Sequence, residues 1–521
     1  MNQIVIYDTT LRDGCQRADI SLSCDDKLAI AHRLDHVGIH YIEAGWPGSN
    51  PKDAEFFQRV RLLPFKNAKI VAFGSTRRKN GACETDDHLK ALIAAGTQTV
   101  TLVGKAWDLH VSKILDTTFE ENLAMVGESI AFAKARVNEV IFDAEHFFDG
   151  FKANPDYATA VVKAAADAGA DYVVLCDTNG GSLPWEIAEI VRTLRERVSC
   201  RLGIHVHNDT GCAVANTLAS VREGCCHIQG TINGYGERVG NADLTTVIAN
   251  LQLKMGLQVI SPEQLRELTG LSRYVAEIAN FSHDRHQPYV GESAFAHKGG
   301  YHASAMLKVA ESYQHTDPQA VGNVSKTIVS ELSGRGNLLS QAREKGLEIS
   351  DEEAQRVLQQ LKKLEHRGFA FEAAEASVEL LFRRARSGYR PPFELIDFMV
   401  LAEHRRVRGL LSEATVKVRV GDEIRFTAAE GNGPVNALAQ ALIQGLSQHY
   451  PQLQKVQLTD YKVRILNTGK GTAAITRVLT DFHDGESCWT TVGASPNIID
   501  ASWQAISDSM EYALTHSATP S

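Results

Sequence analysis

The segment PDYATAVVKAAADAGADYVVLCDT, residues 155–178, contains a complete helix pattern followed at once by a strand pattern. The helix pattern begins at Pro155 and ends at Gly169, and these residue types are favoured just inside the start and just past the end of a helix. The apolar run YVVLCDT then has the length of a strand that is buried on both faces. A helix followed by such a strand is the building block of a parallel α/β fold.

The same unit recurs through the first half of the chain. Short apolar runs end at intervals of 27 to 40 residues, near positions 8, 44, 74, 103, 143, 177, 205 and 232, and a helical pattern fills each gap. Eight strands of this kind predict a (β/α)₈ TIM barrel of about 250 residues. A doubly wound open sheet is the alternative fold, but no G-x-G-x-x-G segment follows the first strand.

The composition excludes several classes of protein. The 521 residues are 44% hydrophobic and 22% charged, with a net charge of −9 and a pI of about 6.1, so no basic surface for nucleic acid is expected. No apolar run reaches the roughly 18 residues that a membrane span needs. We expect no secretion signal, because the N-terminal residues lead straight into a strand pattern, and nine cysteines without a C-x-x-C pair are typical of free thiols. We therefore expect a cytoplasmic protein.

Two histidines lie two residues apart in GIHVHND, residues 203–209, and would share one side of a strand. Chemistry in TIM barrels lies at the carboxyl ends of the strands, where Asp13 and Asn241 are also expected. Two imidazoles and a carboxylate, with an amide oxygen nearby, suit a divalent ion such as Mn²⁺, Mg²⁺, Zn²⁺ or Co²⁺. We therefore predict that Asp13, His205 and His207 hold a metal ion. The alternative is an incidental pair of polar residues.

Arg12 precedes the predicted ligand Asp13. A metal ion with open positions could bind the keto oxygen and carboxylate of a 2-oxo acid and act as a Lewis acid. The guanidinium of Arg12 could then stabilise developing negative charge without titrating. The alternative role for Arg12 is an ion pair at the top of the barrel.

Three motifs carry a resemblance to a known family. DTTLRDGCQ at 8–16, HVHND at 205–209 and GERVGN at 236–241 have the order and spacing of the metal-dependent Claisen-condensing TIM-barrel family. Its members include 2-isopropylmalate, homocitrate and citramalate synthases, and hydroxymethylglutaryl-CoA lyase is a more distant relative. The resemblance covers nearly the whole chain. The segments that look most like the longer type of citramalate synthase are VGKAWDLHV (103–111), FDAEHFFDGFKANPDYA (142–158) and LCDTNGG (175–181).

The resemblance implies a reaction and a set of residue roles. Acetyl-CoA would lose a methyl proton, its enolate would attack the keto carbon of pyruvate, and hydrolysis would release citramalate and CoA. The implied catalytic residues are Arg12, Glu145, His302 and Tyr313, the substrate-binding residues are Arg12, Gln16 and Thr178, and the metal ligands are Asp13, His205, His207 and, more weakly, Asn241. Many family members have Glu where this chain has Cys15, so we expect a tuned site with a packed thiol.

More histidines follow the barrel, in SHDRHQPYVGESAFAHKGGYHA at 282–303. A metal site there is a weak alternative because the spacing is irregular. The resemblance implies that His302, with Tyr313, reaches into the mouth of a barrel, often that of the partner subunit. A histidine whose pKa is near neutrality could exchange protons there. An exposed linker histidine is the other interpretation.

The remaining chain suggests a regulatory domain with an internal repeat. We divide the chain into a catalytic barrel (1–270), a linker subdomain with His302 (271–330), a helical subdomain (331–395) and a regulatory domain (396–521). The last part reads as two copies of a strand–strand–helix unit, and the first hairpin-like strands are expected in TVKVRVGDEIRFTAAEG at 415–431. The two similar helices, at 435–442 and 499–506, each follow a turn, GNGP or GASPN, that could expose backbone N–H groups. The candidate regulatory residues in these turns are Gly431, Asn432, Gly433, Pro434, Pro496 and Asn497.

The family resemblance gives these turns an expected role. It implies a homodimer, or a higher homo-oligomer, that binds a branched-chain amino acid as feedback inhibitor. Isoleucine is expected if the chain is of the citramalate-synthase type, an acyltransferase of class EC 2.3.3 (2.3.3.21 for the (R)-specific enzyme) acting toward isoleucine. The alternatives are a 2-isopropylmalate synthase using 2-oxoisovalerate under leucine control, a lyase running the reverse reaction, and a non-catalytic amino-acid-sensing barrel. A C-terminal domain that only dimerises is also open.

Overall fold

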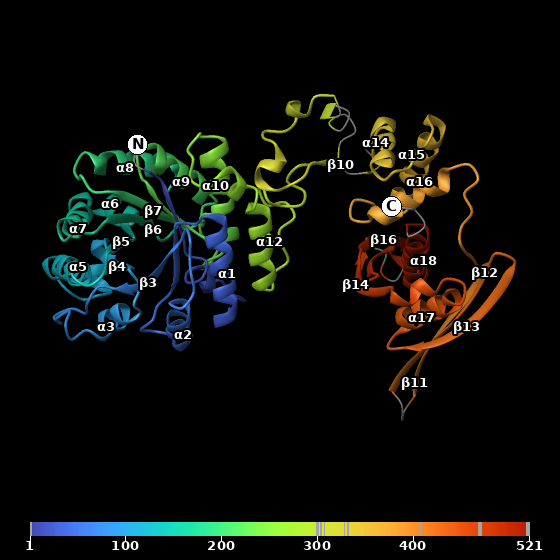
Figure 1. Cartoon of the computed structure of the whole chain (residues 1–521), viewed down its shortest axis with the longest axis horizontal. Helices are drawn as coiled ribbons and strands as arrows, with labels where there is room; N and C mark the ends of the chain where they lie inside the picture. The colour runs from blue at the N-terminus through green and yellow to red at the C-terminus, as the bar shows by residue number, and fades with distance from the viewer. Residues whose placement is uncertain are drawn as a thin grey trace. The chain divides into compact units, whose positions relative to one another are not determined.

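The computed structural model describes residues 3–298, 302, 305–306, 308–327, 329–330, 333–405, 409–466, 471 and 473–516. Many of its helices and strands are labelled in Figure 1. The chain forms two compact units, Met1–Phe295 with Thr316–Ser325, and Ala296–His315 with Lys326–Ser521. Within the described residues, we find no helix with the length and apolar character to cross a membrane.

The first unit is built on a closed barrel of eight parallel strands, which confirms the predicted TIM barrel. The strands follow one another in sequence order, and the last pairs with the first. They are β1 (Val5–Asp8), β2 (Tyr41–Gly45), β3 (Lys69–Ser75), β4 (Thr99–Lys105), β5 (Glu139–Glu145), β6 (Tyr172–Asp177), β7 (Leu202–Val206) and β8 (His227–Gly230). Each strand ends within two residues of the expected position.

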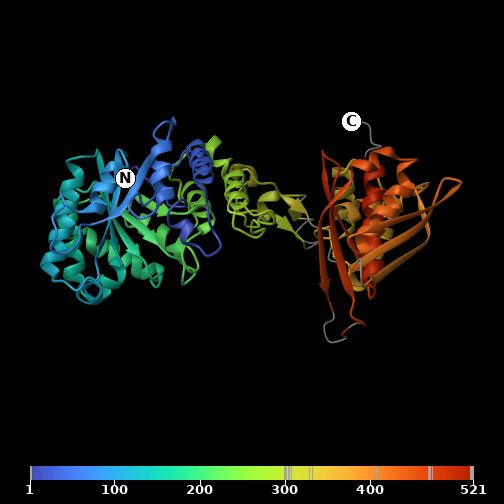
Figure 2. The ribbon, with the colours of Figure 1, turned by 90° about the horizontal axis from the view of Figure 1, so that it is seen from below.

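Helices surround the barrel in both views (Figures 1 and 2). They are α1 (Cys24–Val37), α2 (Pro51–Val60), α3 (Asp87–Ala94), α4 (Asp108–Lys113), α5 (Phe119–Lys134), α6 (Phe147–Ala153), α7 (Pro155–Asp167), α8 (Pro184–Arg195), α9 (Ala213–Arg222), α10 (Leu244–Leu253), α11 (Pro262–Leu265) and α12 (Leu268–Ile278). The start of α7 shows why this helix could be predicted from the sequence. Asn154 caps the helix by accepting a hydrogen bond from the N–H of Tyr157, and Pro155 occupies the first helical position. Gly169 then takes a positive φ of 95° past the helix end.

A mostly helical segment connects the barrel to the C-terminal sheets. Two short parallel strands, β9 (Ala296–His297) and β10 (Lys326–Thr327), pair with each other. The helices that follow are α14 (Arg335–Glu344), α15 (Asp351–His366) and α16 (Glu375–Ala385). Their apolar faces form one core together with Val492 of a C-terminal strand, and the helices agree with the predicted helical portion.

The C-terminal region contains two copies of one antiparallel unit, each with three strands and a helix. The first copy comprises β11 (Glu394–Arg405), β12 (Gly409–Val420), β13 (Glu423–Gly431) and α17 (Pro434–Ser447). The second comprises β14 (Gln457–Ile465), β15 (Thr476–His483), β16 (Cys488–Ser495) and α18 (Ile498–His516). The internal repeat is therefore present, but the expected strand–strand–helix unit lacked one strand. β11 was missed because its outward residues Met399 and Leu401 are apolar like its inward ones, which hides the alternation of a half-buried strand.

Candidate functional site

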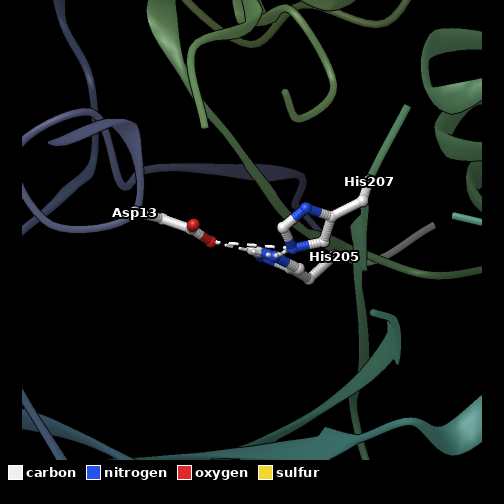
Figure 3. A group of neighbouring side chains, drawn as sticks. All are labelled: Asp13, His205 and His207. Atoms are coloured by element: carbon white, nitrogen blue, oxygen red, sulfur yellow. Dashed lines mark hydrogen bonds and ion pairs between the residues drawn. The ribbon is translucent and has the colours of Figure 1, made fainter. Parts of the chain in front are cut away.

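Asp13, His205 and His207 meet at the carboxyl end of the barrel (Figure 3). His205 lies in β7, His207 directly follows that strand, and Asp13 lies in the turn after β1. Oδ2 of Asp13 is 3.3 Å from Nε2 of His205 and 3.9 Å from Nε2 of His207, and the two Nε2 atoms are 3.3 Å apart. All three side chains are buried. The structure thus brings together the three residues that the sequence proposed as metal ligands.

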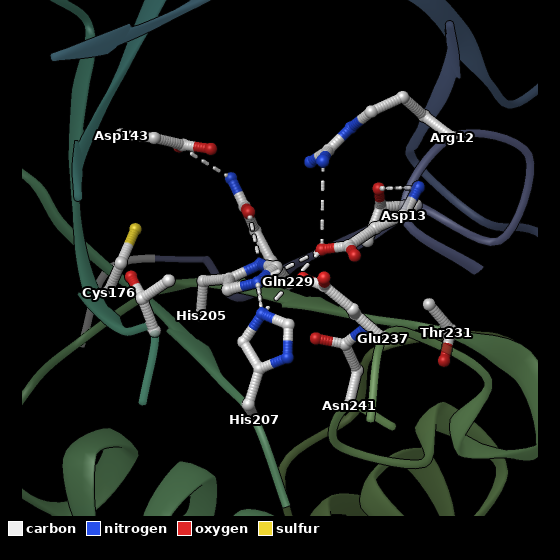
Figure 4. A network of polar contacts seen from close by, with 12 residues as sticks. Arg12, Asp13, Asp143, Cys176, His205, His207, Gln229, Thr231, Glu237 and Asn241 are labelled. Atoms are coloured by element: carbon white, nitrogen blue, oxygen red, sulfur yellow. Dashed lines mark hydrogen bonds and ion pairs between the residues drawn. The ribbon is translucent and has the colours of Figure 1, made fainter. Parts of the chain in front are cut away.

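Buried polar atoms without partners surround this cluster. Asp13 Oδ1, His207 Nδ1 and Asn241 Oδ1 make no hydrogen bond to any residue that the structure describes. The Asn241 amide N–H donates to the carbonyl of Tyr235 at 3.1 Å, so the amide oxygen is left for another partner. Asn241 forms a β-bridge with His207, and Figure 4 shows its side chain beside that histidine. An unsatisfied buried acceptor costs about 1–3 kcal/mol, so these oxygens and imidazoles fit a bound divalent cation.

The orientation of His205 is set by a buried amide on the neighbouring strand. His205 Nδ1 is 2.9 Å from Oε1 of Gln229 in β8, and Gln229 Nε2 donates to Asp143 Oδ1 at 2.9 Å (Figure 4). Because the amide nitrogen serves Asp143, its oxygen faces His205 as an acceptor. Nδ1 of His205 therefore carries the proton, and its Nε2 presents a lone pair to the cluster.

The ionisation of the cluster suits a cation. Burial alone would raise the pKa of Asp13, but the adjacent Arg12 and the nearby His205 hold that pKa well below its usual range. Burial, together with the nearby His205, lowers the pKa of His207 to about 4. Near neutral pH the cluster therefore offers a carboxylate and a neutral imidazole, which are the protonation states of metal ligands.

Arg12 is held beside the cluster by Glu43 in β2. Its Nε donates to Glu43 Oε1 at 2.6 Å, and its guanidinium lies 4.0 Å from the ring centre of Phe73. Glu43 also accepts hydrogen bonds from the hydroxyl groups of Tyr7 and Thr9. Burial opposes the charge, but the carboxylates of Glu43 and Asp13 raise the pKa of Arg12. Arg12 is thus a fixed cation at the site. It forms an ion pair, as one of the two predicted roles requires, and it also lies beside the cluster, as the other requires.

A cavity of about 230 Å³ opens beside these groups. Its walls include Gln16, Glu145 and Thr178, as the sequence proposed, and also residues that the sequence did not single out. The lining residues are Arg12, Asp13, Gln16, Trp46, Phe73, Val103, Asp143, Glu145, Cys176, Thr178, His205, His207 and Glu237. The volume suits a small organic acid, with polar groups on one part of the wall and apolar groups on another.

Two residues that line this cavity, Glu145 and Thr178, are held by polar contacts. Lys105 at the end of β4 pairs with Oε2 of Glu145 at the end of β5, and each side chain is about one-quarter exposed. The backbone N–H of His146 donates to Thr178 Oγ1 at 3.0 Å. This bond occupies an acceptor site of the Thr178 hydroxyl, which keeps its own proton to donate.

The HMGL-like family model matches residues 3–275. The chain belongs to the HMGL-like family. Two further models match the rest of the chain: the homocitrate synthase post-HMGL domain-like model over residues 289–368, and the LeuA allosteric (dimerisation) domain over residues 372–514.

Relatives that match nearly the whole length of this HMGL-like protein include citramalate and 2-isopropylmalate synthases. It is 53% identical over 517 residues to the (R)-citramalate synthase of Geobacter sulfurreducens, covering 99% of this chain and 98% of the relative. It is 52% identical over 516 residues to the (R)-citramalate synthase of Aquifex aeolicus, covering 98% of each. The 2-isopropylmalate synthase of Methylacidiphilum infernorum is 30% identical over 522 residues, with 98% of this chain and 99% of the relative covered. The suspected family resemblance is thereby confirmed.

His302 and Tyr313 belong to the second unit, whereas the cluster belongs to the first. Their ring centres are 4.5 Å apart, and the ring of Tyr313 also lies 6.4 Å from that of His297. The only group of three or more metal-ligating side chains among the described residues is the one in the barrel. The weak alternative of a metal site among the later histidines therefore has no support, and the roles of His302 and Tyr313 stay proposals.

Cys15 is a packing residue in this HMGL-like barrel. Its side chain is partly buried against the apolar core, and its thiol donates to the carbonyl of Thr10 at 3.7 Å. Burial raises the pKa of the thiol to about 11, so it stays protonated near neutral pH. Cys15 is not part of the ligand group.

The two turns proposed as regulatory start α17 and α18 in different ways. Asn497 accepts hydrogen bonds from the backbone N–H groups of Ile499 and Asp500 at 2.8 and 3.4 Å, so its side chain caps α18. The turn before α17 has no side-chain cap, with Gly433 at the capping position and Pro434 after it. The N–H groups at the start of α17 are therefore the less satisfied of the two sets.

Sequence reasoning missed four residues that organise the site: Trp46, Lys105, Asp143 and Gln229. Gln229 and Asp143 occupy inward positions of β8 and β5, so strand parity could have found them once the barrel was assumed. Lys105 lies opposite Glu145 in the pairing of β4 with β5, and that pairing is visible only in the structure.

Proposed function

We propose that this protein is a citramalate synthase, which condenses acetyl-CoA with pyruvate and hydrolyses the thioester to give citramalate and CoA. The observation that carries the proposal is the cavity of about 230 Å³ on which the Asp13, His205 and His207 cluster, Arg12 and Glu145 converge. The size of this cavity and its apolar wall of Phe73, Val103 and Cys176 suit a 2-oxo acid with a short side chain. The greater identity to proteins named (R)-citramalate synthase than to a 2-isopropylmalate synthase supports the same choice.

The metal is proposed from the same donors. Asp13, His205 and His207, with Asn241 as a further oxygen donor, would hold Mn²⁺, Mg²⁺, Zn²⁺ or Co²⁺. The bound ion would supply Lewis-acid polarisation of the keto group of the 2-oxo acid. Gln229 contributes by keeping Nε2 of His205 unprotonated and aimed at the cluster.

Arg12, Gln16 and Thr178 bind and orient the 2-oxo acid. The Thr178 hydroxyl, which already accepts from His146, donates its proton to the substrate carboxylate. Arg12 is fixed by Glu43 and needs no rearrangement to stabilise the negative charge that develops on the keto oxygen as the new bond forms. Because the guanidinium is already in place, we expect it to stabilise the transition state more than the bound substrate, and so to raise kcat more than it lowers KM.

Glu145 is the proposed site of proton transfer. Its Oε2 is held by Lys105, while its Oε1 makes no hydrogen bond to a described residue and lines the cavity. Oε1 accepts the proton that leaves the acetyl methyl group, and the carbon–carbon bond to the keto carbon forms. Water then cleaves the thioester, and CoA leaves as the thiol. His302 and Tyr313 are proposed to exchange protons in these steps, on the strength of the family resemblance.

A thiol-release assay with acetyl-CoA and a panel of 2-oxo acids tests the function. We expect pyruvate to exceed 2-oxoisovalerate in kcat/KM by more than roughly 10-fold, because 2-oxoisovalerate has two more carbons than pyruvate and even one surplus methylene is worth about 1–3 kcal/mol in a pocket. A preference for 2-oxoisovalerate would establish the 2-isopropylmalate synthase alternative. No release with any 2-oxo acid would favour the non-catalytic sensor.

We also propose that isoleucine inhibits the enzyme through the turns at Gly431–Pro434 and at Pro496 and Asn497. A Cβ on Gly431 would lie 2.4 Å from the backbone nitrogen of Ala437, so Gly431→Ala must shift the turn before α17. A Cβ on Gly433 would meet nothing within 4 Å, which makes Gly433→Ala a matched control. We expect Gly431→Ala to lose inhibition by isoleucine and keep its uninhibited rate, and Gly433→Ala to keep both. Inhibition that survives Gly431→Ala unchanged would place the sensor elsewhere.

The chain is proposed to be a homodimer through the sheet of β11, β12 and β13. One face of this sheet packs on α17, while the other exposes large apolar side chains, with Met399 at 61% and Phe426 at 66% exposure. Apolar patches of this kind mark interfaces, and the matched LeuA model describes a dimerisation domain. Phe426→Lys should shift the sedimentation coefficient from that of a dimer toward that of a monomer. An unchanged coefficient would move the interface to another surface.

A cytoplasmic location is proposed from the state of the thiols. None of the nine cysteines forms a disulfide bond in the structure, and five of them are buried. Reduced thiols in this number are typical of a reducing compartment.

A further inference from the structure

Trp46 stands between two cavities at the end of β2. The cavity of about 230 Å³ described above and a second cavity of about 270 Å³ share three lining residues, Arg12, Gln16 and Trp46. The second cavity continues on the other side of these residues, past Ile20 and Leu22. Of the three shared side chains, Trp46 is the large apolar one. The indole is therefore the side chain that closes the substrate cavity against further space.

The backbone of Trp46 is anchored by a buried ion pair. Its N–H donates to Asp53 Oδ2 at 2.9 Å, and Asp53 Oδ1 pairs with Lys27 Nζ at 2.5 Å. Lys27 also donates to the carbonyl of Ala44 at 3.0 Å. Gly45, just before the indole, takes a φ of +151°, and a Cβ there would lie 2.4 Å from the Asp53 carboxyl carbon. Two charged side chains, each less than a tenth exposed, thus fix the start of this loop.

The ring of Trp46 packs edge to face on the site itself. Its centre lies 5.5 Å from that of Phe73, with the planes at 79°, and 6.0 Å from that of His88. The guanidinium of Arg12 in turn lies over the ring of Phe73. The indole Nε1–H is buried and has no acceptor among the described residues. The position of the ring is therefore set by its packing and by the anchored backbone, with no hydrogen bond from the indole to a described residue.

We infer that Trp46 contacts the 2-oxo acid and sets the upper limit on its side-chain length. This inference rests on the proposed function and deepens it. The indole forms the end wall for the substrate's alkyl group, and removing it joins the cavity to the space of about 270 Å³ behind. A longer 2-oxo acid could then enter without displacing Arg12 or the cluster.

The test compares kcat/KM for pyruvate, 2-oxobutyrate and 2-oxovalerate in the full-length protein. In Trp46→Ala we expect the preference for pyruvate over 2-oxovalerate to fall at least about tenfold, since the longer substrate gains space that it lacks in the parent. Trp46→Leu should give a smaller fall, and Trp46→Phe the smallest. Ile20→Ala is the matched control, because it enlarges only the second cavity and should leave the preference unchanged.

The ratio of two substrates in one variant does not depend on the fraction of folded protein, so partial misfolding cannot imitate the result. A preference that stays within about twofold of the parent's in both Trp46→Ala and Trp46→Leu would overturn the inference. Failure of the proposed function is a different outcome: the parent protein itself would then release no thiol with pyruvate.

Discussion

Two histidine environments inside the same barrel differ in what they can do. His205 lies near the carboxyl end of β7, and His227 begins β8 level with Gly203, two residues earlier along the neighbouring strand. His205 meets the Asp13 carboxylate and the Gln229 amide. His227 instead lies among the rings of Tyr7, Tyr41 and Tyr172, with centres 4.7 to 5.5 Å away, and neither of its ring nitrogens has a partner among the described residues.

The difference shows that height along the strand decides the role of a buried polar residue in this fold. Burial lowers the pKa of His227 to about 3, so it is a neutral ring that fills the barrel interior. Burial also opposes the charge on His205, but Asp13 outweighs it and raises the pKa of His205. The carboxyl end of the barrel supplies charged partners from the turns after the strands, and the other end supplies only other side chains of the packed interior.

The largest expected effect is the loss of the metal site. His205→Ala should lower divalent-metal affinity by more than about 100-fold and abolish turnover, because a ligand is removed and outer partners alone are worth 10- to 100-fold. Equilibrium dialysis and the thiol-release assay measure the two effects. His227→Phe is the matched control and should bind metal like the parent. Full activity of the parent in metal-free buffer with chelator would refute the role of the cluster.

Arg12→Ala should reduce kcat by about 10²-fold or more, since a fixed cation at the developing charge acts in the transition state. Arg12→Lys should recover little of this loss, because an ammonium group cannot reproduce the planar contacts with Glu43 and Phe73. Steady-state kinetics with pyruvate measure both. A rise in KM with kcat intact would instead make Arg12 a simple binding residue.

Gln229→Leu should weaken metal binding by about 10- to 100-fold while all the ligands remain. The variant loses the acceptor that fixes the proton of His205 on Nδ1, and so frees the ring to take the other tautomer. The metal dissociation constant from dialysis is the measurement. If that constant stays within twofold of the parent's, the Gln229 contact does not position the ligand.

The smallest effect concerns His227 and stability. Its folded pKa of about 3 lies below the unfolded value of about 6.5, so below pH 6.5 the unfolded state binds a proton that the folded state does not. This difference in proton binding lowers the free energy of unfolding of the parent by about 2 kcal/mol between pH 7 and pH 5. His227→Phe should therefore lose less stability than the parent over this interval, in thermal melts recorded at both pH values. Parallel losses in the two proteins would mean that His227 is charged or solvated in the folded state.

The sequence predicted the barrel and most of the cavity wall for one physical reason. Buried parallel strands are continuous apolar runs, and the topology of the barrel places every carboxyl end at one mouth, so Asp13 and His205 meet although they are far apart in the chain. The contact between Gln229 and Asp143 was not predicted, because it crosses the barrel interior between β8 and β5, which are not neighbouring strands. Trp46 was overlooked because a tryptophan after a strand is indistinguishable in sequence from a core residue.

The strands of the C-terminal repeat were harder to predict from the sequence than those of the barrel. Its strands are half-exposed, and their identification depends on alternation, which β11 lacks where Met399 and Leu401 point away from α17. The capping difference between the turns before α17 and α18 was also hidden, since both turns contain Asn, Gly and Pro, and only the structure shows that Asn497 caps its own helix.

The X-ray absorption spectrum of the Co²⁺-loaded protein tests the central claim most directly. Two imidazole ligands and oxygen donors should be visible in the parent, and one imidazole should disappear in His207→Ala, while His227→Phe leaves the spectrum unchanged. A bound ion without imidazole scattering, or a spectrum that is the same in the parent and in His207→Ala, would contradict the account.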